Sequence, residues 1–279
     1  MLSHARSRVL LSSRLERTLR PRSHTGGRHE LGQNFLTHRP TLQRLTTLTA
    51  ATEGAILEIG AGDGALTRHL VRLGRDLRAI DIDARRVDRL RAHVDGASIH
   101  RADALHEPLN RPVIVGNIPF HLTTPLLRRL LDADGWQHSI LLTQWEVARK
   151  RAGVGGTTMM TAQAGPWYTF RLHDRVPARH FRPMPAVDGG ILSIERRTAP
   201  LLPRHDRRRF DRFVAAVFRS RGNGIRQILR GVGHQPAAVD RALSEAGIAR
   251  SALPRDLTPE QWARMWQRLD EGVRRKGGQ

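Results

Sequence analysis

Two short runs of this chain hold residues that could bind a nucleoside and act on one of its nitrogen atoms. The first run, Glu58 to Gly64, has glycines at alternate positions and follows the apolar residues 55–57. Glycines at a strand-to-helix turn let the backbone approach a ligand closely, and the following helix offers unpaired N–H donors. The run lacks the last glycine of the dinucleotide-binding fingerprint, because Ala65 stands there.

Two carboxylates follow at positions typical of a nucleoside site. Asp81 ends a second apolar run, 77–80, about 20 residues after the first glycine, where such folds place the carboxylate that holds a ribose. Asp103 follows a predicted strand at 97–100, and a carboxylate there could accept the exocyclic amino group of an adenine. The alternative interpretation is a glycine turn without a nucleoside and an aspartate that only forms a turn.

The second run is Asn117 to Phe120, after a predicted strand at 112–115. Pro119 has no N–H and disfavours a helical conformation at Ile118, so the run stays extended with its carbonyls facing outward. An amide oxygen and a neighbouring carbonyl can accept both hydrogens of an exocyclic amine, and an aromatic ring can stack on the base. The alternative is a loop with an ordinary proline turn.

These groups fit the transfer of a methyl group to a base amine. Such an amine is a poor nucleophile, but two acceptors localise its lone pair and aim it at a sulfonium methyl, without a metal or a strong base. The chain has no cysteine, which excludes thiol chemistry at cytosine C5, and its 14 histidines lack the spacing of a metal site. The residues therefore indicate an amino-group methyltransferase that uses S-adenosylmethionine and no metal.

The charge of the chain indicates a polyanionic partner. Its 279 residues carry a formal charge of +21, and all of the cations except Lys150 and Lys276 are arginines, which suit bidentate phosphate contacts. The alternative is that the charge serves solubility alone. No apolar run approaches the roughly 18 residues that span a membrane, so a cytoplasmic protein is expected.

Strand and helix patterns alternate up to about residue 199, with further strands at 139–143, 168–176 and 190–195, and predict an α/β sheet. Helical patterns then take over and predict a small helical domain with a basic face. Thr37 is expected to cap a helix that has Pro40 in its first turn, and Thr258 to open the last helix as a near capping box.

The arginine-rich composition of residues 1–28 predicts a flexible basic arm that strengthens RNA binding. The alternatives are a tail without a role and an organellar transit peptide.

Several segments resemble, in order, the motifs of the erythromycin-resistance (Erm) rRNA adenine N6-methyltransferases: 32–36, Glu58 to Gly64, Asp81, Asp103, 117–120 and 181–188. The resemblance runs from about Arg28 to Arg196 and extends into the helical region. It implies a Rossmann-like class I methyltransferase sheet with a small C-terminal helical domain. The expected domains are the arm (1–28), the methyltransferase domain (29–199) and a helical RNA-binding domain (200–279).

The resemblance also implies roles for individual residues. Asn117, with the Ile118–Pro119 backbone, would hold the target amine, and Phe120 and Phe181 would sandwich the extruded adenine. The S-adenosylmethionine site would comprise Asn34, Leu36, Gly60, Gly62, Asp81, Asp103, Ala104 and Asn117. The implied partner is 23S rRNA, before the ribosome is fully assembled, and the protein would act as a monomer. Methylation of that RNA blocks macrolide, lincosamide and streptogramin B drugs.

Some residues depart from the family pattern, and other functions stay open. Phe120 stands where tyrosine is commoner and Gly189 where serine is frequent, which leaves the extent of methylation undecided. The first alternative is the related small-subunit (16S) rRNA adenine dimethylase, although Ile118 stands where that family usually has leucine. The second is a non-catalytic RNA-binding protein or transcription factor on the same fold. An NAD-dependent enzyme is disfavoured by Ala65 and by the lack of an acid or base for hydride transfer.

Overall fold

A computed structural model describes residues 34–277 of the chain, with side chains as far as Glu271. The predicted arm, residues 1–28, lies outside the described residues. Gly32–Gln279 forms one compact unit, and all that follows concerns its described part. The predicted domain boundary at 199/200 remains a prediction.

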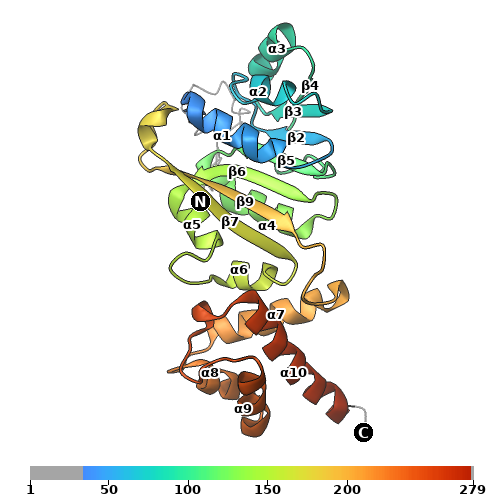
Figure 1. The fold of residues 1–279 in the computed structure, drawn as a ribbon, viewed down its shortest axis with the longest axis vertical. Coiled ribbons are helices and arrows are strands. Elements are labelled where there is room, and N and C mark those ends of the chain that lie inside the picture. Colours follow the sequence, from blue (N-terminus) through green and yellow to red (C-terminus); the bar gives the residue numbers. More distant parts are fainter. Residues whose placement is uncertain (1–33, 278–279) are drawn as a thin grey trace, which may run out of the picture. The chain divides into compact units, whose positions relative to one another are not determined.

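A seven-stranded sheet with the strand order β4-β3-β2-β5-β6-β9-β7 forms the centre of this unit (Figure 1). The strands from β4 to β6 run parallel, and β9 lies antiparallel between β6 and β7. The predicted α/β class is therefore confirmed. The strands are β2 (Ile56–Ile59), β3 (Leu77–Asp81), β4 (Ser98–Arg101), β5 (Val113–Asn117), β6 (His138–Gln144), β7 (Tyr168–Val176) and β9 (Gly189–Arg196).

A second, two-stranded sheet joins segments that lie far apart in the sequence. Strand β1 (Phe35–Leu36) pairs antiparallel with β8 (Phe181–Arg182), so that Phe35 lies opposite Arg182 and Leu36 opposite Phe181. This pairing places the segment before the first helix beside the loop between β7 and β9.

Helices cover both faces of the large sheet because successive strand residues point to opposite sides. In β2, Leu57 packs on the side of α4, whereas Ile56 packs on the side of α1 and α2. The helices of this part are α1 (Arg39–Ala50), α2 (Thr67–Val71), α3 (Ala84–His93), α4 (Thr123–Asp132), α5 (Trp145–Arg151) and α6 (Met159–Ala164). Strands buried on both faces explain the continuous apolar runs in the sequence.

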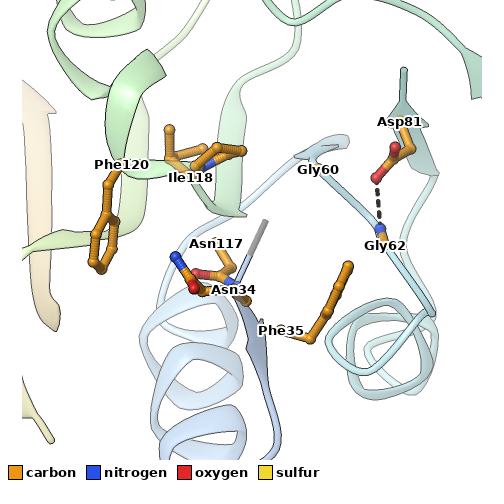
Figure 2. Close-up of a pocket in the computed structure, with 9 residues that line it drawn as sticks. Asn34, Phe35, Gly60, Gly62, Asp81, Asn117, Ile118 and Phe120 are labelled. Carbon is orange, nitrogen blue, oxygen red and sulfur yellow. Dashed lines mark hydrogen bonds between the residues drawn. The ribbon is translucent and has the colours of Figure 1, made fainter. Parts of the chain in front are cut away.

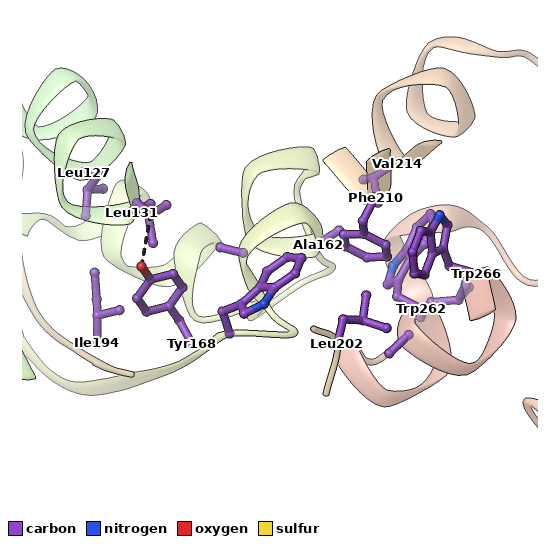
Figure 3. Close-up of a cluster of buried hydrophobic side chains, with 14 of the residues drawn as sticks. Leu127, Leu131, Ala162, Tyr168, Ile194, Leu202, Phe210, Val214, Trp262 and Trp266 are labelled. Carbon is purple, nitrogen blue, oxygen red and sulfur yellow. Dashed lines mark hydrogen bonds between the residues drawn. The ribbon is translucent and has the colours of Figure 1, made fainter. Parts of the chain in front are cut away.

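The C-terminal part is helical, as the sequence predicts. Its helices are α7 (Arg207–Arg219), α8 (Ile225–Gly231), α9 (Pro236–Glu245) and α10 (Pro259–Gly277). Their core continues into that of the sheet, and Figure 3 shows Phe210 and Trp266 beside each other in it. The ring centroids of Trp167 and Phe210 lie 5.7 Å apart, as do those of Phe210 and Trp266. The buried hydroxyl of Tyr168 donates to the Leu131 carbonyl oxygen at 3.0 Å and ties the start of β7 to α4.

The helix-capping predictions have mixed outcomes. Thr258 and Gln261 form the reciprocal bonds of a capping box before α10, as predicted. The Asp83 carboxylate caps α3 by accepting backbone N–H groups of its first turn. The prediction for Thr37 is wrong, because His38 is the N-cap of α1. Both the N–H and the hydroxyl of Thr37 donate to the carbonyl oxygen of His180, at 2.9 and 3.0 Å, and so extend the pairing of β1 with β8.

The helix after the glycine turn is short and comprises only the five residues of α2. Among the helices that the structure describes, none is both long and apolar enough to cross a membrane.

Gly116 in β5 generates a stability prediction. A Cβ there would lie 2.3 Å from the Ile59 carbonyl oxygen of β2, which is backbone and cannot swing aside. We expect Gly116→Ala to lower the free energy of unfolding in urea by about 2–3 kcal/mol. Gly231→Ala is the control, because a Cβ at the end of α8 meets no atom within 4 Å and stability should be unchanged or slightly higher. Equal stability of the two variants would contradict the close strand packing.

Candidate active site

The glycine turn connects β2 to α2 in a conformation that needs glycine. Gly60 and Gly62 have φ values of 75° and 56°, in the left-handed region that other residues rarely adopt. The N–H groups of Gly60 and Ala61 donate to the Ile80 carbonyl oxygen at 2.9 and 3.0 Å and hold the turn against β3. A Cβ on Gly62 would lie 3.0 Å from the Phe35 ring, so only glycine lets that ring approach.

Asp81 lies at the carboxyl end of β3 and is almost completely buried, with 5% of its surface exposed. One carboxylate oxygen accepts the Gly62 N–H at 2.8 Å (Figure 2). The other accepts the Asp83 N–H at 3.0 Å. Each oxygen has a second lone pair for a ligand. Asp81 thus shapes the glycine turn, a contribution that the sequence spacing alone did not predict.

Asn117 lies at the carboxyl end of β5, beside the segment that leads into β1. Its side-chain N–H donates to the Asn34 carbonyl oxygen at 2.7 Å. This bond fixes which end of the amide is the donor, so the side-chain oxygen is left without a partner among the described residues. Figure 2 shows the two asparagines side by side, between Phe120 and the glycine turn with Asp81.

The turn after Asn117 is held by the sheet. The Ile118 N–H donates to the Leu142 carbonyl oxygen at 2.9 Å, and the Ile118 side chain is buried in the core. The Pro119 carbonyl oxygen accepts the Leu122 N–H at 2.8 Å, which leaves the Ile118 carbonyl as the second acceptor beside Asn117. Pro119 is extended, with φ −52° and ψ 130°, as predicted.

A pocket of about 360 Å³, partly open to solvent, brings most of the predicted site residues together. Its lining residues are Asn34, Phe35, Gly60, Gly62, Asp81, Asn117, Ile118, Pro119 and Phe120. An adjoining pocket of about 410 Å³ shares Asn117 and the glycine turn with it. The predicted residue Leu36 lines this second pocket.

Three predicted residues lie outside both pockets. Asp103 and Ala104 follow β4, and the Asp103 carboxylate accepts the Leu105 N–H and bonds to His106 Nδ1, each at 2.8 Å. The Leu105 N–H, helped by His106, holds the pKa of Asp103 below its usual range, against the raising effect of burial. Phe181 is fully buried, and its ring meets that of Phe120 edge-on, with centroids 6.3 Å apart and planes at 73°.

Two residues that line the site, Phe35 and Glu58, were not predicted to do so. Phe35 lines both pockets, and the guanidinium of Arg86 lies 4.2 Å from its ring centroid. Its neighbours Asn34 and Leu36 were predicted, so its position in the same short run was the available signal. Glu58 lines the second pocket with 1% of its surface exposed. It directly precedes the glycine turn at the end of a buried strand, which could have identified it.

A mainly parallel sheet with an antiparallel β9, a glycine turn after β2, an acidic residue at the end of β3 and a polar residue at the end of β5 defines a Rossmann-like methyltransferase. A family model described as ribosomal RNA adenine dimethylase matches residues 25–271. The chain belongs to that family, whose cofactor is S-adenosylmethionine.

Named relatives refine this assignment. The chain is 48% identical to an rRNA adenine N-6-methyltransferase of Corynebacterium diphtheriae, over 84% of this chain and 94% of the relative. It is 46% identical to the mycinamicin-resistance protein MyrB of Micromonospora griseorubida, over 87% and 79%. The crystal structure of the 23S rRNA methyltransferase ErmE superposes with a TM-score of 0.76 at 31% identity, over 85% of this chain and 100% of ErmE. A small-subunit rRNA methyltransferase A of Streptomyces coelicolor is 29% identical over 84% and 88%.

The pocket residues fit this cofactor. The buried carboxyl groups of Asp81 and Glu58 can accept or donate hydrogen bonds and so suit a ligand with hydroxyl groups. The glycine turn supplies a wall without side chains. We expect Asp81, the glycine turn and Asn34 to hold S-adenosylmethionine here.

Glu58 generates a pH prediction. Burial raises the pKa of Glu58 from 4.5 to about 7. The folded state therefore binds a proton that the unfolded state releases between these values, and stability falls as the pH rises through this range. From pH 5 to 8, we expect the unfolding free energy of the wild type to fall by about 2–3 kcal/mol relative to that of Glu58→Gln.

Urea unfolding at a series of pH values measures this effect. Glu53→Gln, which removes an exposed glutamate before the same strand, is the control and should leave the pH dependence of the wild type in place. Parallel curves for the wild type and Glu58→Gln would contradict the raised pKa.

Proposed function

We propose that this protein transfers a methyl group from S-adenosylmethionine to N6 of an adenine in 23S rRNA and thereby confers resistance to macrolide, lincosamide and streptogramin B antibiotics. The observation that carries this proposal is the oriented amide of Asn117 at the mouth of a glycine-walled pocket. Relatives named for rRNA adenine methylation and for mycinamicin resistance support the substrate and the outcome.

Asn117 and the backbone beside it position the amine. With its N–H bonded to Asn34, the Asn117 side-chain oxygen can accept one amine hydrogen, and the Ile118 carbonyl oxygen can accept the other. This pairing turns the nitrogen lone pair away from the base ring and toward the pocket. S-adenosylmethionine, when bound, supplies an electrophilic methyl group, and its sulfur keeps the electron pair of the broken bond. The methylated amine releases one of its hydrogens as a proton to water. Positioning and electrostatics suffice for this transfer, so the site needs no strong base.

Phe120 and Phe181 differ in whether their rings are accessible to a base in this site. Phe120 lines the pocket and can stack on the adenine, which contributes about 1–3 kcal/mol per base in comparable sites. Phe181 would form the other side of the predicted sandwich only if its buried ring became exposed. We therefore assign the stacking to Phe120, with Phe181 supporting that ring by its edge.

The other residues proposed to bind the cofactor lie at different distances from Asn117. Gly60, Gly62 and Asp81 share the pocket with Asn117, and Leu36 lines the adjoining one. Asp103 and Ala104 lie outside both pockets. They would contact only a part of the cofactor that extends past the end of β4.

The setting of the reaction follows from charge and from the relatives. We assign RNA binding to the basic residues of 200–279, assisted by the arm 1–28, because arginines displace counterions from phosphates. We also propose that the protein acts as a cytoplasmic monomer, on 23S rRNA that is not yet fully assembled into ribosomes. Mapping of the modified adenine by primer extension tests the substrate: a stop in 16S rRNA would instead support a small-subunit dimethylase.

Asn117→Ala tests the amine-holding role. We expect methyl transfer to fall at least 100-fold, because the acceptor that orients the amine is lost, while RNA binding is retained. Incorporation of radiolabelled methyl groups into protein-free 23S rRNA measures the first effect and filter binding the second. Asn110→Ala, at an exposed asparagine before β5, is the control and should be fully active. Normal turnover by Asn117→Ala would refute the role, and an inactive wild type would favour a non-catalytic RNA-binding protein.

Asp81→Ala tests the cofactor site. Loss of a buried carboxylate that can accept hydroxyl groups should weaken S-adenosylmethionine binding by about tenfold or more. Isothermal titration calorimetry measures this dissociation constant, and Asp95→Ala, at an exposed aspartate after α3, provides the control. Unchanged binding by Asp81→Ala would remove Asp81 from the site.

A further inference from the structure

The loop between β8 and β9 exposes apolar side chains next to the active site. Met184 and Val187 have 63% and 47% of their surfaces exposed, and they are two of the four large hydrophobic residues exposed in the described part of the chain. Single exposed apolar residues are common on proteins, but two on one short loop indicate a contact surface. The proline residues at 183 and 185 restrict the backbone around Met184.

The base of this loop is firmly held. The Asp188 carboxylate accepts the Ala178 N–H at 2.8 Å and pairs with Arg175 at 2.7 Å, and the Asp188 carbonyl oxygen accepts the Trp145 N–H at 2.9 Å. A loop held in this way at its base keeps its apolar tip, Met184 and Val187, away from the protein surface. Met184 is therefore presented to a partner.

The tip lies close to the pocket that holds Asn117. Arg182 pairs with Phe35, which lines that pocket, and Met184 is two residues further along the chain, within about 7 Å of Arg182. Figure 1 shows the segment between β7 and β9 projecting past the end of the sheet, beside the start of α1.

The charges around the tip fit a nucleic acid. Arg179 and Arg182 are exposed, and neither has an ion-pair partner among the described residues. Two free guanidinium groups beside an apolar tip match the alternation of phosphates and stacked bases in RNA. A hydrophobic peptide would leave these charges without partners.

We propose that Met184, supported by Val187 on the same loop, is a wedge that enters the base stack of the RNA and occupies the space left when the target adenine turns out. This inference rests on the proposed function. The amine acceptors lie at the edge of a pocket, and an adenine paired in a helix cannot bring its amine there without leaving the stack, which costs the free energy of pairing and stacking. Apolar side chains inserted between base steps offset such a loss in other nucleic-acid-binding proteins.

The test compares two RNAs with the same sequence around the target adenine, one with that adenine paired in a helix and one with it unpaired. Single-turnover methyl transfer by Met184→Ser should fall about tenfold on the paired RNA and less than about twofold on the unpaired RNA. Met184→Leu keeps an apolar side chain of similar size and should match the wild type on both. Val154→Ala, at another exposed apolar residue, is the surface control and should also match it.

A second measurement tests directly whether Met184 unstacks the RNA bases, without requiring methyl transfer. With 2-aminopurine next to the target adenine, wild-type protein should increase the fluorescence by unstacking this base, and Met184→Ser should not. An equal loss on both RNAs, or no loss on either, would overturn the wedge. If the wild type methylates neither RNA, the proposed function fails, while the fluorescence still decides whether Met184 enters the stack.

Discussion

The hydrogen bond from the Asn117 amide to the Asn34 carbonyl oxygen is the constraint on which the site depends. An amide has a donor end and an acceptor end, and committing the donor to a backbone carbonyl leaves the acceptor to face the pocket. The bond joins the end of β5 to a segment 83 residues earlier in the chain. That segment is itself held by β8, so the orientation of one side chain depends on two remote pairings.

The acidic residues of the site are buried, whereas most of the arginines are exposed. The carboxylates of the site, Glu58 and Asp81, are inside, where the glycine turn and the strand ends surround them. The excess arginine is mostly outside, where it can meet phosphates without neutralising the cofactor site. Burial raises the pKa of Glu58 to about 7. The charge of this side chain near neutral pH is therefore set by its burial as well as by the pH of the solution.

Much of this arrangement could be predicted from local patterns. Apolar runs identified the strands, and the glycine turn, Asp81 and Asn117 followed from the rule that ligands bind at the carboxyl ends of parallel strands. Features that depend on partners distant in sequence could not be predicted. Thr37 looks like a helix cap until His180 supplies a competing acceptor, and Phe181 looks available for stacking until the fold buries it. Nothing local indicates that Asp81 also binds the glycine turn.

The aromatic contacts from Trp167 through Phe210 to Trp266 couple the unfolding of the sheet part to that of the C-terminal helices. Because one hydrophobic cluster serves both the sheet and the C-terminal helices, neither part can melt without uncovering rings that belong to the other. The C-terminal helices therefore stabilise the sheet part of the enzyme. A chain that ends before them would expose apolar core side chains to water.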